Sequence, residues 1–343
     1  MLNPLKPTLL CSALALAQAG SACADTIVAQ QFAPLTTVSP ELAQFLQLPP
    51  VGWDVHPQTA EQWEELVQSS IPLSEQLVDH LCTQYELTVT PETIAGVPCF
   101  RITPPHQPQL KQDQVLLYLH CGGYVLNPGK AGLVEALPLA GIGGYTIIAV
   151  DYRMAPQHPY PAAIDDAFAV YQELLQTTPA SKIGIFGSSS GGAMSLIVPM
   201  MCQEKGIAQP GAVMAGTPWS DLGKVGDTYY SHEGVDQTMV SYEGWLKDAV
   251  RVYAGDHDLK DPHLSPVYGD YSNFPPLLLI AGTRDLFLSN TVRVQAKMLA
   301  AKRPVELIVY EGISHAQYFF FPDVPETKQH YRNVTAFFER YLQ

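Results

Sequence analysis

Basic residues are scarce in this chain, and their scarcity excludes one class of partner. Among 343 residues, 19 lysines and arginines stand against 33 aspartates and glutamates, a formal net charge of −14 at pH 7. A surface this acidic repels nucleic acid and anionic membranes. We therefore expect no nucleic-acid partner.

Long hydrophobic runs and internal repeats are also missing. After the N-terminus no apolar run is long enough to span a bilayer, and no segment recurs at a fixed period. At 47% hydrophobic residues the chain can still bury a full core. We expect one large catalytic domain with an elaboration and no membrane span. The oligomeric state is left open by the sequence.

Cysteine is sparse as well, with six residues and no Cys-x-x-Cys spacing, which argues against structural zinc. Asp256-His257-Asp258, with Asp261 and His263 nearby, has a metal-like composition. The alternative interpretation, an acidic solvated loop, is favoured. We therefore expect neither a metal nor a cofactor.

The first 24 residues have the composition of a signal peptide. Lys6 is the only positive side chain, residues 8–17 are apolar, and Ala22-Cys23-Ala24 is a small-x-small pattern. We expect cleavage after Ala24 and export to the periplasm or medium. A lipoprotein processing site at Cys23 is the less favoured alternative.

Export would leave an even number of cysteines, which permits a disulfide without requiring one. The four are Cys82, Cys99, Cys121 and Cys202. Cys82 and Cys99 flank the start of the first expected hairpin, and they form the only pair that the sequence suggests.

Helical and strand-like patterns alternate along most of the chain. Residues 61–67 and 72–81 have helical periodicity, and we assign residues 25–84 to an N-terminal helical cap segment. Residues 86–90 and 97–103 predict a hairpin, with a turn beginning at Pro91. Brief apolar runs typical of strands covered on both faces follow at residues 115–119, 145–150, 182–186, 276–281 and 305–310.

Amphipathic stripes fill the gaps between these runs, for example Ile164, Phe168, Tyr171 and Leu175, and again Tyr331, Val334, Phe337 and Tyr341. Alternating strands and helices predict an α/β fold for residues 85–343, with a mostly parallel central sheet and helices on both faces. A long insertion at about residues 218–268 is rich in aromatic and acidic residues. We expect it to be a partly helical cap over the site.

A nucleophile is indicated by the pattern Gly-x-Ser-x-Gly at residues 187–191. It follows an apolar strand-like run and opens onto a helix-like stretch, which predicts a strand, a sharp turn and a helix. Glycines two positions either side of Ser189 allow the close approach that such a turn requires. The motif alone also fits an ordinary glycine-rich loop, so further elements are needed.

A base and an acid follow Ser189 in the required order. Asp285 comes after the run at residues 276–281, and His315 comes after the run at residues 305–310. Both positions are loops at the carboxyl ends of strands, where α/β sheets place functional side chains. Asp285 could instead cap the following helix, and Glu311 is a rival acid that is poorly placed to turn back to His315. Ser, Asp, His is the order found in α/β-hydrolases.

An oxyanion hole is indicated by His120-Cys121-Gly122-Gly123, directly after the run at residues 115–119. Acyl transfer places negative charge on a former carbonyl oxygen, and fixed backbone N–H groups stabilise it. Gly122 and Gly123 can bring such amides close, and the amide of Ser190 would be a third donor.

With these motifs the chain resembles the hormone-sensitive-lipase-like α/β-hydrolases, the bacterial family IV esterases, over residues 86–343. Residues 120–123 correspond to the family's His-Gly-Gly-Gly, and residues 187–192 to its elbow. Residues 151–163 correspond to its Asp-Tyr-Arg-Leu-Ala-Pro-Glu-His-Pro-Phe-Pro-Ala-Ala block, which supports the site from behind. The resemblance implies a triad of Ser189, Asp285 and His315, with oxyanion donors at Gly122, Gly123 and Ser190.

Four positions depart from the family pattern. Cys121 replaces the first glycine, Ser188 and Ser190 replace the usual aspartate and alanine of the elbow, and Ser289 stands where a second aspartate is common. Since Ser190 would donate through its backbone, its side chain should be tolerated.

The sequence therefore predicts an exported serine carboxylic-ester hydrolase acting on small or short-acyl esters through an acyl-enzyme, with a small-molecule ester as its substrate. The aromatic residues Tyr124, Trp219 and residues 318–321 indicate a compact apolar pocket. A lactone hydrolase is the nearest alternative. A thiol nucleophile at Cys121 and a binding protein without catalysis are disfavoured, the latter because all three triad residues are present.

Overall fold

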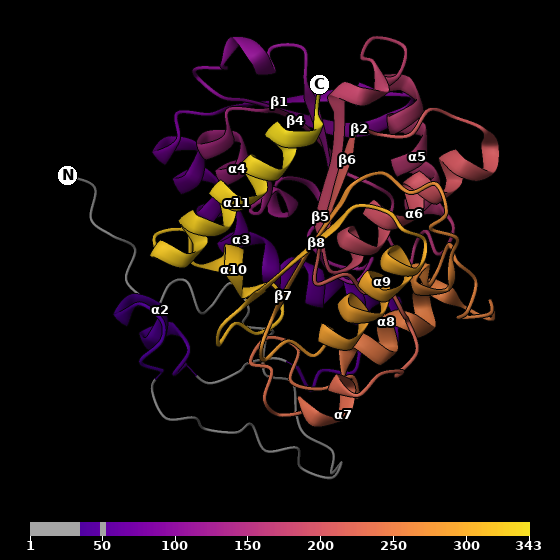
Figure 1. Ribbon diagram of the computed structural model, residues 1–343. Coiled ribbons are helices and arrows are strands. Elements are labelled where there is room, and N and C mark those ends of the chain that lie inside the picture. Colours follow the sequence, from indigo (N-terminus) through magenta and orange to yellow (C-terminus); the bar gives the residue numbers. More distant parts are fainter. Residues whose placement is uncertain (1–34, 49–52) are drawn as a thin grey trace.

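A computed structural model describes residues 35–48 and 53–343. Across these residues eight strands form a sheet in the order β1-β2-β4-β3-β5-β6-β7-β8 (Figure 1). The strands are β1 Thr88–Ile94, β2 Val97–Thr103, β3 Val115–Leu119, β4 Thr146–Val150, β5 Ile183–Ser188, β6 Ala212–Gly216, β7 Leu277–Gly282 and β8 Val305–Tyr310. β2 is antiparallel to β1 and β4, and the other neighbouring pairs are parallel. The expected signal peptide lies outside the described residues.

Helices cover both faces of this sheet, as the sequence predicts (Figure 1). The hydrophobic cluster on one face includes residues of α5 Ala162–Leu174, α6 Ser190–Lys205, α8 Trp245–Ala254 and α9 Leu288–Ala300. The cluster on the other face includes residues of α4 Ala136–Gly143, α10 Gln317–Phe320, α11 Pro325–Tyr341 and the C-terminal part of α3 Ala60–Gln84. Two short helices, α2 Pro40–Phe45 and α7 Thr228–Ser231, complete the set of described α-helices.

Alternation along the strands explains why the core has two layers. In β3, Val115, Leu117 and Leu119 belong to the first hydrophobic cluster, whereas Leu116 and Tyr118 belong to the second. Successive side chains of a strand point to opposite faces, so a strand that is apolar throughout is buried from both sides. The prediction of an α/β fold with a mostly parallel sheet is confirmed.

One strand escaped the sequence analysis. β6 Ala212–Gly216 lies between β5 and β7 in the middle of the sheet. Its residues include two alanines and a glycine, which have little strand preference of their own. Pairing with two neighbours and complete burial decide its conformation, and neither is visible locally.

The first hairpin turns later than expected. β1 continues through Pro91, which pairs with Phe100, and the turn is at Ala95 and Gly96, with φ of 50° and 81°. Two consecutive positive φ values suit the tight turns that join antiparallel strands. Pro91 is tolerated because β1 is an edge strand and pairs only with β2.

The two helices expected at residues 61–67 and 72–81 are one helix, α3, which runs through Pro72. Thr59 and Gln62 form a capping box at its start. Near the proline, the Ser70 hydroxyl donates to the Val67 carbonyl and the Ser74 hydroxyl donates to the Ser70 carbonyl. No helix in the described part of the chain is long and apolar enough to cross a membrane.

The suggested Cys82–Cys99 disulfide is wrong, since both cysteines are free. Cys99 belongs to the hydrophobic cluster on one face of the sheet, whereas Cys82 packs against the cluster on the other face. The sheet therefore separates the two thiols. Proximity to the same hairpin in sequence did not indicate this, because the side chains of β2 alternate between faces.

Candidate active site

Ser189 occupies a sharp turn between β5 and α6. Its backbone has φ 59° and ψ −122°, a conformation that a residue with a side chain rarely adopts. The flanking glycines make this turn possible, because a Cβ atom on Gly187 or Gly191 would lie 2.2 Å or 1.9 Å from the Leu119 carbonyl oxygen. The strand, turn and helix expected around Ser189 are therefore present.

The structure brings His315 and Asp285 together. His315 Nδ1 lies 3.2 Å from Asp285 Oδ1, and both side chains are almost completely buried. Glu311, the rival acid, is exposed. Because Nδ1 faces a carboxylate, the ring proton belongs on that nitrogen, and Nε2 remains free to accept a proton.

Thr217, which the sequence analysis missed, completes this pair. Its hydroxyl donates to Asp285 Oδ2, and the Thr217 hydroxyl oxygen lies 2.8 Å from His315 Nδ1. The imidazole N–H is therefore shared between the Asp285 carboxylate and the Thr217 hydroxyl. Thr217 directly follows β6, so recognising that strand would have placed it at the carboxyl edge of the sheet.

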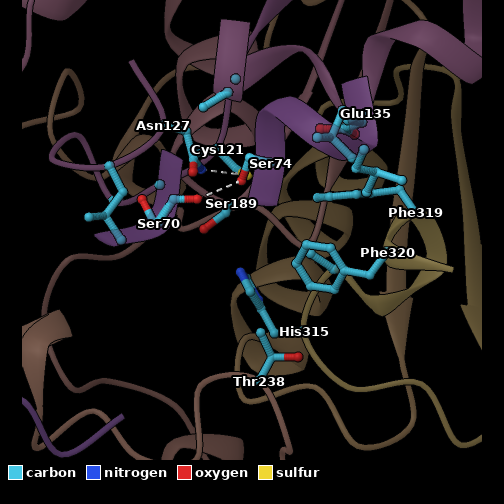
Figure 2. Close-up of a pocket in the computed structure, with 18 of the residues that line it drawn as sticks. Ser70, Ser74, Cys121, Asn127, Glu135, Ser189, Thr238, His315, Phe319 and Phe320 are labelled. Atoms are coloured by element: carbon cyan, nitrogen blue, oxygen red, sulfur yellow. Dashed lines mark hydrogen bonds between the residues drawn. The ribbon is translucent and has the colours of Figure 1, made fainter. Parts of the chain in front are cut away.

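Ser189 and His315 line the same cavity. Figure 2 shows the His315 ring beside Ser189, with a ring nitrogen directed toward the serine. His315 Nε2 is buried and has no hydrogen-bond partner among the described residues. A hydroxyl, a free imidazole nitrogen and a carboxylate are thus gathered at the carboxyl ends of β5, β8 and β7.

The expected oxyanion loop has the left-handed backbone that glycine permits, with φ of 124° at Gly122 and 62° at Gly123. Both glycines line the cavity beside Ser189. The Gly123 N–H, however, donates to the Ser190 hydroxyl at 3.0 Å. One of the three expected donors therefore already has an acceptor, which the sequence analysis did not foresee.

Residues 151–163 support this loop from behind, as expected. Tyr152 stacks on the His120 ring at 4.0 Å and donates its hydroxyl to the His120 carbonyl. Arg153 makes a bidentate ion pair with Asp166, whose carboxylate also accepts from the Arg153 backbone N–H. The Tyr152 contacts hold the backbone just before the glycines, and the Arg153 ion pair ties the segment behind it to α5.

Cys121 lines the cavity but has the wrong protonation state for a nucleophile. Burial raises the pKa of its thiol to about 12, so the thiolate is scarce at neutral pH. Its sulfur and its carbonyl oxygen both accept from the Asn127 amide. The chemistry therefore favours Ser189 over Cys121.

Ser188, at the family's aspartate position, is joined to a buried acid. Its hydroxyl donates to Glu135 Oε1 at 2.5 Å and lies 2.6 Å from the Tyr318 hydroxyl, which must then be the donor in that pair. Burial raises the pKa of Glu135 to about 8. The family carries an aspartate at the position of Ser188. Here the carboxyl group next to that position comes instead from Glu135, at the start of α4.

Ser289, where the family often has a second aspartate, links α9 to the insertion instead. Its backbone N–H donates to the Thr228 hydroxyl at 2.9 Å, and its own hydroxyl accepts from the Thr228 N–H at 3.0 Å. This reciprocal pair ties the segment after Asp285 to α7.

The cavity has a volume of about 130 Å³. Figure 2 shows Ser70, Ser74, Cys121 and Asn127 on one side of Ser189, and Phe319 and Phe320 on the other. The remaining lining includes Leu77 of α3 and three residues of the insertion, Thr238, Met239 and Trp245. Substrate would therefore contact α3, the insertion and the sheet edge together.

The aromatic residues expected around this pocket have divided roles. Phe319 and Phe320 line it, but Tyr124 and Trp219 are fully buried and stack on Tyr253 and Phe287 in the core. Phe321 stacks on Phe45 of α2 at 4.1 Å. The prediction was therefore wrong for Tyr124, Trp219, Tyr318 and Phe321, none of which lines the cavity. Sequence alone does not distinguish a core ring from a pocket ring.

The acidic segment at residues 256–263 forms no cluster suited to a metal ion within the described residues. His263 instead pairs with Glu204 at 3.0 Å, and Asp261 accepts from the His263 backbone N–H. Asp256, His257 and Asp258 are exposed.

Comparisons with known proteins identify the family of this chain. A family model described as the alpha/beta hydrolase fold matches residues 116–319. The chain belongs to this family, in its hormone-sensitive-lipase-like branch. The crystal structure of an esterase E25 is 36% identical, with a TM-score of 0.88, and the match covers 93% of this chain and 99% of that one.

Further relatives have related activities in their names. A putative acetyl-hydrolase, LipR, of Mycobacterium tuberculosis is 30% identical over 69% of this chain and 75% of its own length. An esterase of Acinetobacter venetianus is 28% identical over 76% of this chain and 86% of its own length. A structure of an esterase from the bacterial hormone-sensitive lipase family, 26% identical, has a TM-score of 0.75 and covers 84% of this chain and 94% of its own. The protein is accordingly a carboxylesterase-type hydrolase.

Proposed function

We propose that this protein hydrolyses short-acyl carboxylic esters through a triad of Ser189, His315 and Asp285. The observation that carries the proposal is the orientation of the His315 ring. Its Nδ1 faces the Asp285 carboxylate. Its Nε2, which has no hydrogen-bond partner in the described part of the chain, belongs to a residue that lines the same cavity as Ser189. A base oriented in this way is what a serine nucleophile requires.

In the proposed reaction Ser189 Oγ attacks the ester carbonyl while His315 Nε2 takes its proton. Asp285 stabilises the imidazolium, and the amides of Gly122, Gly123 and Ser190 stabilise the oxyanion. The imidazolium then protonates the leaving alcohol, and an acyl group remains on Ser189. Water, deprotonated by His315, releases the acid and restores the free serine.

Short acyl groups are supported by the size of the cavity. At about 130 Å³ it is close to a cavity of roughly 150 Å³ that accommodates one benzene molecule. An acetyl or butyryl group fits in such a space, whereas a long fatty-acyl chain does not.

The triad is tested by Ser189→Ala, Asp285→Asn and His315→Ala, assayed on p-nitrophenyl acetate and butyrate. We expect hydrolysis to fall by roughly a thousandfold or more in the serine and histidine variants. Ser195→Ala is the matched control, because Ser195 is a buried serine of α6, the helix that follows Ser189, and its hydroxyl donates to the Gly191 carbonyl. Circular dichroism should show native folding in each variant.

Two outcomes would change this proposal. Full turnover by Ser189→Ala would remove Ser189 from the mechanism. Faster hydrolysis of small lactones than of any linear ester by the wild-type protein would replace the substrate class while leaving the triad in place.

We further propose that the protein is exported, on the basis of Lys6, the apolar residues 8–17 and the pattern ending at Ala24. Fractionation of the native host should find it outside the cytoplasm, with Asp25 at the mature N-terminus. Mature protein that retains Met1 would refute export.

A further inference from the structure

Asp236 is a buried acid of the insertion that the proposed chemistry does not use. It lies between α7 and α8 and is 1% exposed. A carboxylate enclosed in protein requires hydrogen-bond donors to compensate for lost hydration. The hydrogen-bond donors around Asp236 therefore indicate its role.

Backbone N–H groups supply those donors. Oδ1 accepts from Thr238 and Met239, at 2.8 Å and 2.9 Å. Oδ2 accepts from Leu286 at 2.7 Å and from His315 at 3.2 Å. Hydrogen bonds to an ionised acceptor are stronger than those between neutral groups.

The two contacts of Oδ2 join the two loops of the proposed triad. Leu286 directly follows Asp285, and the second donor is the backbone of His315 itself. A single oxygen atom thus fixes the backbone on both sides of the 3.2 Å contact between the Asp285 carboxylate and the imidazole. Loops are mobile by default, so this contact depends on such a restraint.

The two contacts of Oδ1 reach the substrate cavity, because Thr238 and Met239 both line it. The same carboxylate therefore holds part of the cavity wall and the loops that carry the acid and the base. Displacing that wall would strain the geometry of the triad.

We infer that Asp236 is a positioning residue, which couples the insertion over the cavity to the relative placement of Asp285 and His315. This inference rests on the proposed function, since positioning matters only if these two residues are catalytic. Asp236 touches neither the substrate nor the reacting atoms.

The test is Asp236→Asn, which keeps one oxygen for Thr238 and Met239 but presents an NH₂ group to the N–H groups of Leu286 and His315. We expect kcat for p-nitrophenyl butyrate to fall roughly ten- to a hundredfold, with KM changed less than about threefold. The rate of serine labelling by an organophosphate should fall in the same proportion, because it too depends on the base.

Asp221→Asn is the matched control. Asp221 is another buried aspartate of the insertion, but its carboxylate bonds to Arg293, Tyr268 and the Gly223 N–H, away from the triad. We expect this variant to lose stability and to keep its kcat per active site. Titration of active sites with the organophosphate corrects each variant for misfolded protein.

A wild-type kcat per titrated site in Asp236→Asn would overturn the inference. A loss confined to the number of active sites would also overturn it, because Asp236 would then serve folding alone. Ser189→Ala is assayed in parallel: if that variant stays active, the proposed function fails, and if it is inactive while Asp236→Asn is normal, only the positioning role fails.

Discussion

At the scale of single residues, the hydroxyl of Ser190 changes the expected oxyanion hole. The family's alanine has no acceptor at this position, whereas Ser190 Oγ accepts from the Gly123 N–H at 3.0 Å. Preorganised donors are effective because nothing must be rearranged when charge develops. In the proposed reaction the Ser190 hydroxyl would therefore compete with the oxyanion for one donor.

Ser190→Ala should accordingly raise kcat. Freeing the amide removes a neutral hydrogen bond worth about 0.5–1.5 kcal/mol, which corresponds to roughly a two- to tenfold increase. Steady-state kinetics on p-nitrophenyl acetate measures this, with Ser195→Ala as the control on the same helix. A kcat that stays level or falls would mean that the hydroxyl is needed to hold the loop.

At the scale of elements, α3 matters more than its place before the sheet suggests. Its residues Ser70, Ser74 and Leu77 line the same cavity as Ser189 and the phenylalanines of α10, although these segments are far apart in the sequence. If Ser189 is the nucleophile as proposed, this helix would limit the length of the acyl group that can reach it.

Leu77→Ala should shift the preference toward longer acyl groups, because it enlarges the cavity at this wall. We expect the ratio of kcat/KM for p-nitrophenyl octanoate over acetate to rise, at a cost of about 2–5 kcal/mol in unfolding free energy. Leu81→Ala is the control, since Leu81 is buried on the same helix but is not part of the cavity lining. Equal ratios in the two variants would show that α3 does not set the limit.

At the scale of the whole molecule, the acidic composition is largely a surface property, and the few buried acids have special environments. Glu135 is the clearest case, since burial raises its pKa from 4.5 to about 8. A raised pKa means that the folded state holds the proton more tightly than the unfolded chain. The resulting stabilisation is complete below pH 4.5 and is lost as the pH rises toward 8.

Glu135→Gln should remove this dependence, because the amide stays neutral and still accepts from Ser188. Relative to wild type, the variant's unfolding free energy should increase by about 2–3 kcal/mol between pH 6 and pH 9. Urea unfolding at the two pH values measures it. Glu65→Gln, an exposed position on α3, serves as the control and should show no such change. If the unfolding free energies of Glu135→Gln and wild type differed by the same amount at both pH values, the raised pKa would be contradicted.

The sequence by itself determined most of the sheet and the helices that cover it, since apolar runs and amphipathic stripes record which faces are buried. It missed β6, divided α3 into two helices and placed the first hairpin turn too early. It also brought Ser189, Asp285 and His315 to one edge, because parallel strands end together and the loops after them are neighbours. The turn at Ser189 was predictable from its glycines for the same local reason.

Only the tertiary structure decided which side chains meet across distant segments. Three hydrogen bonds join residues that are far apart in the chain: Thr217 with His315, Asp236 with Leu286, and Ser190 with Gly123. The pairing of Cys82 and Cys99 failed for the same reason, since the sheet lies between them. Such contacts depend on distances and directions of a few ångströms, and residue type or spacing does not encode these locally.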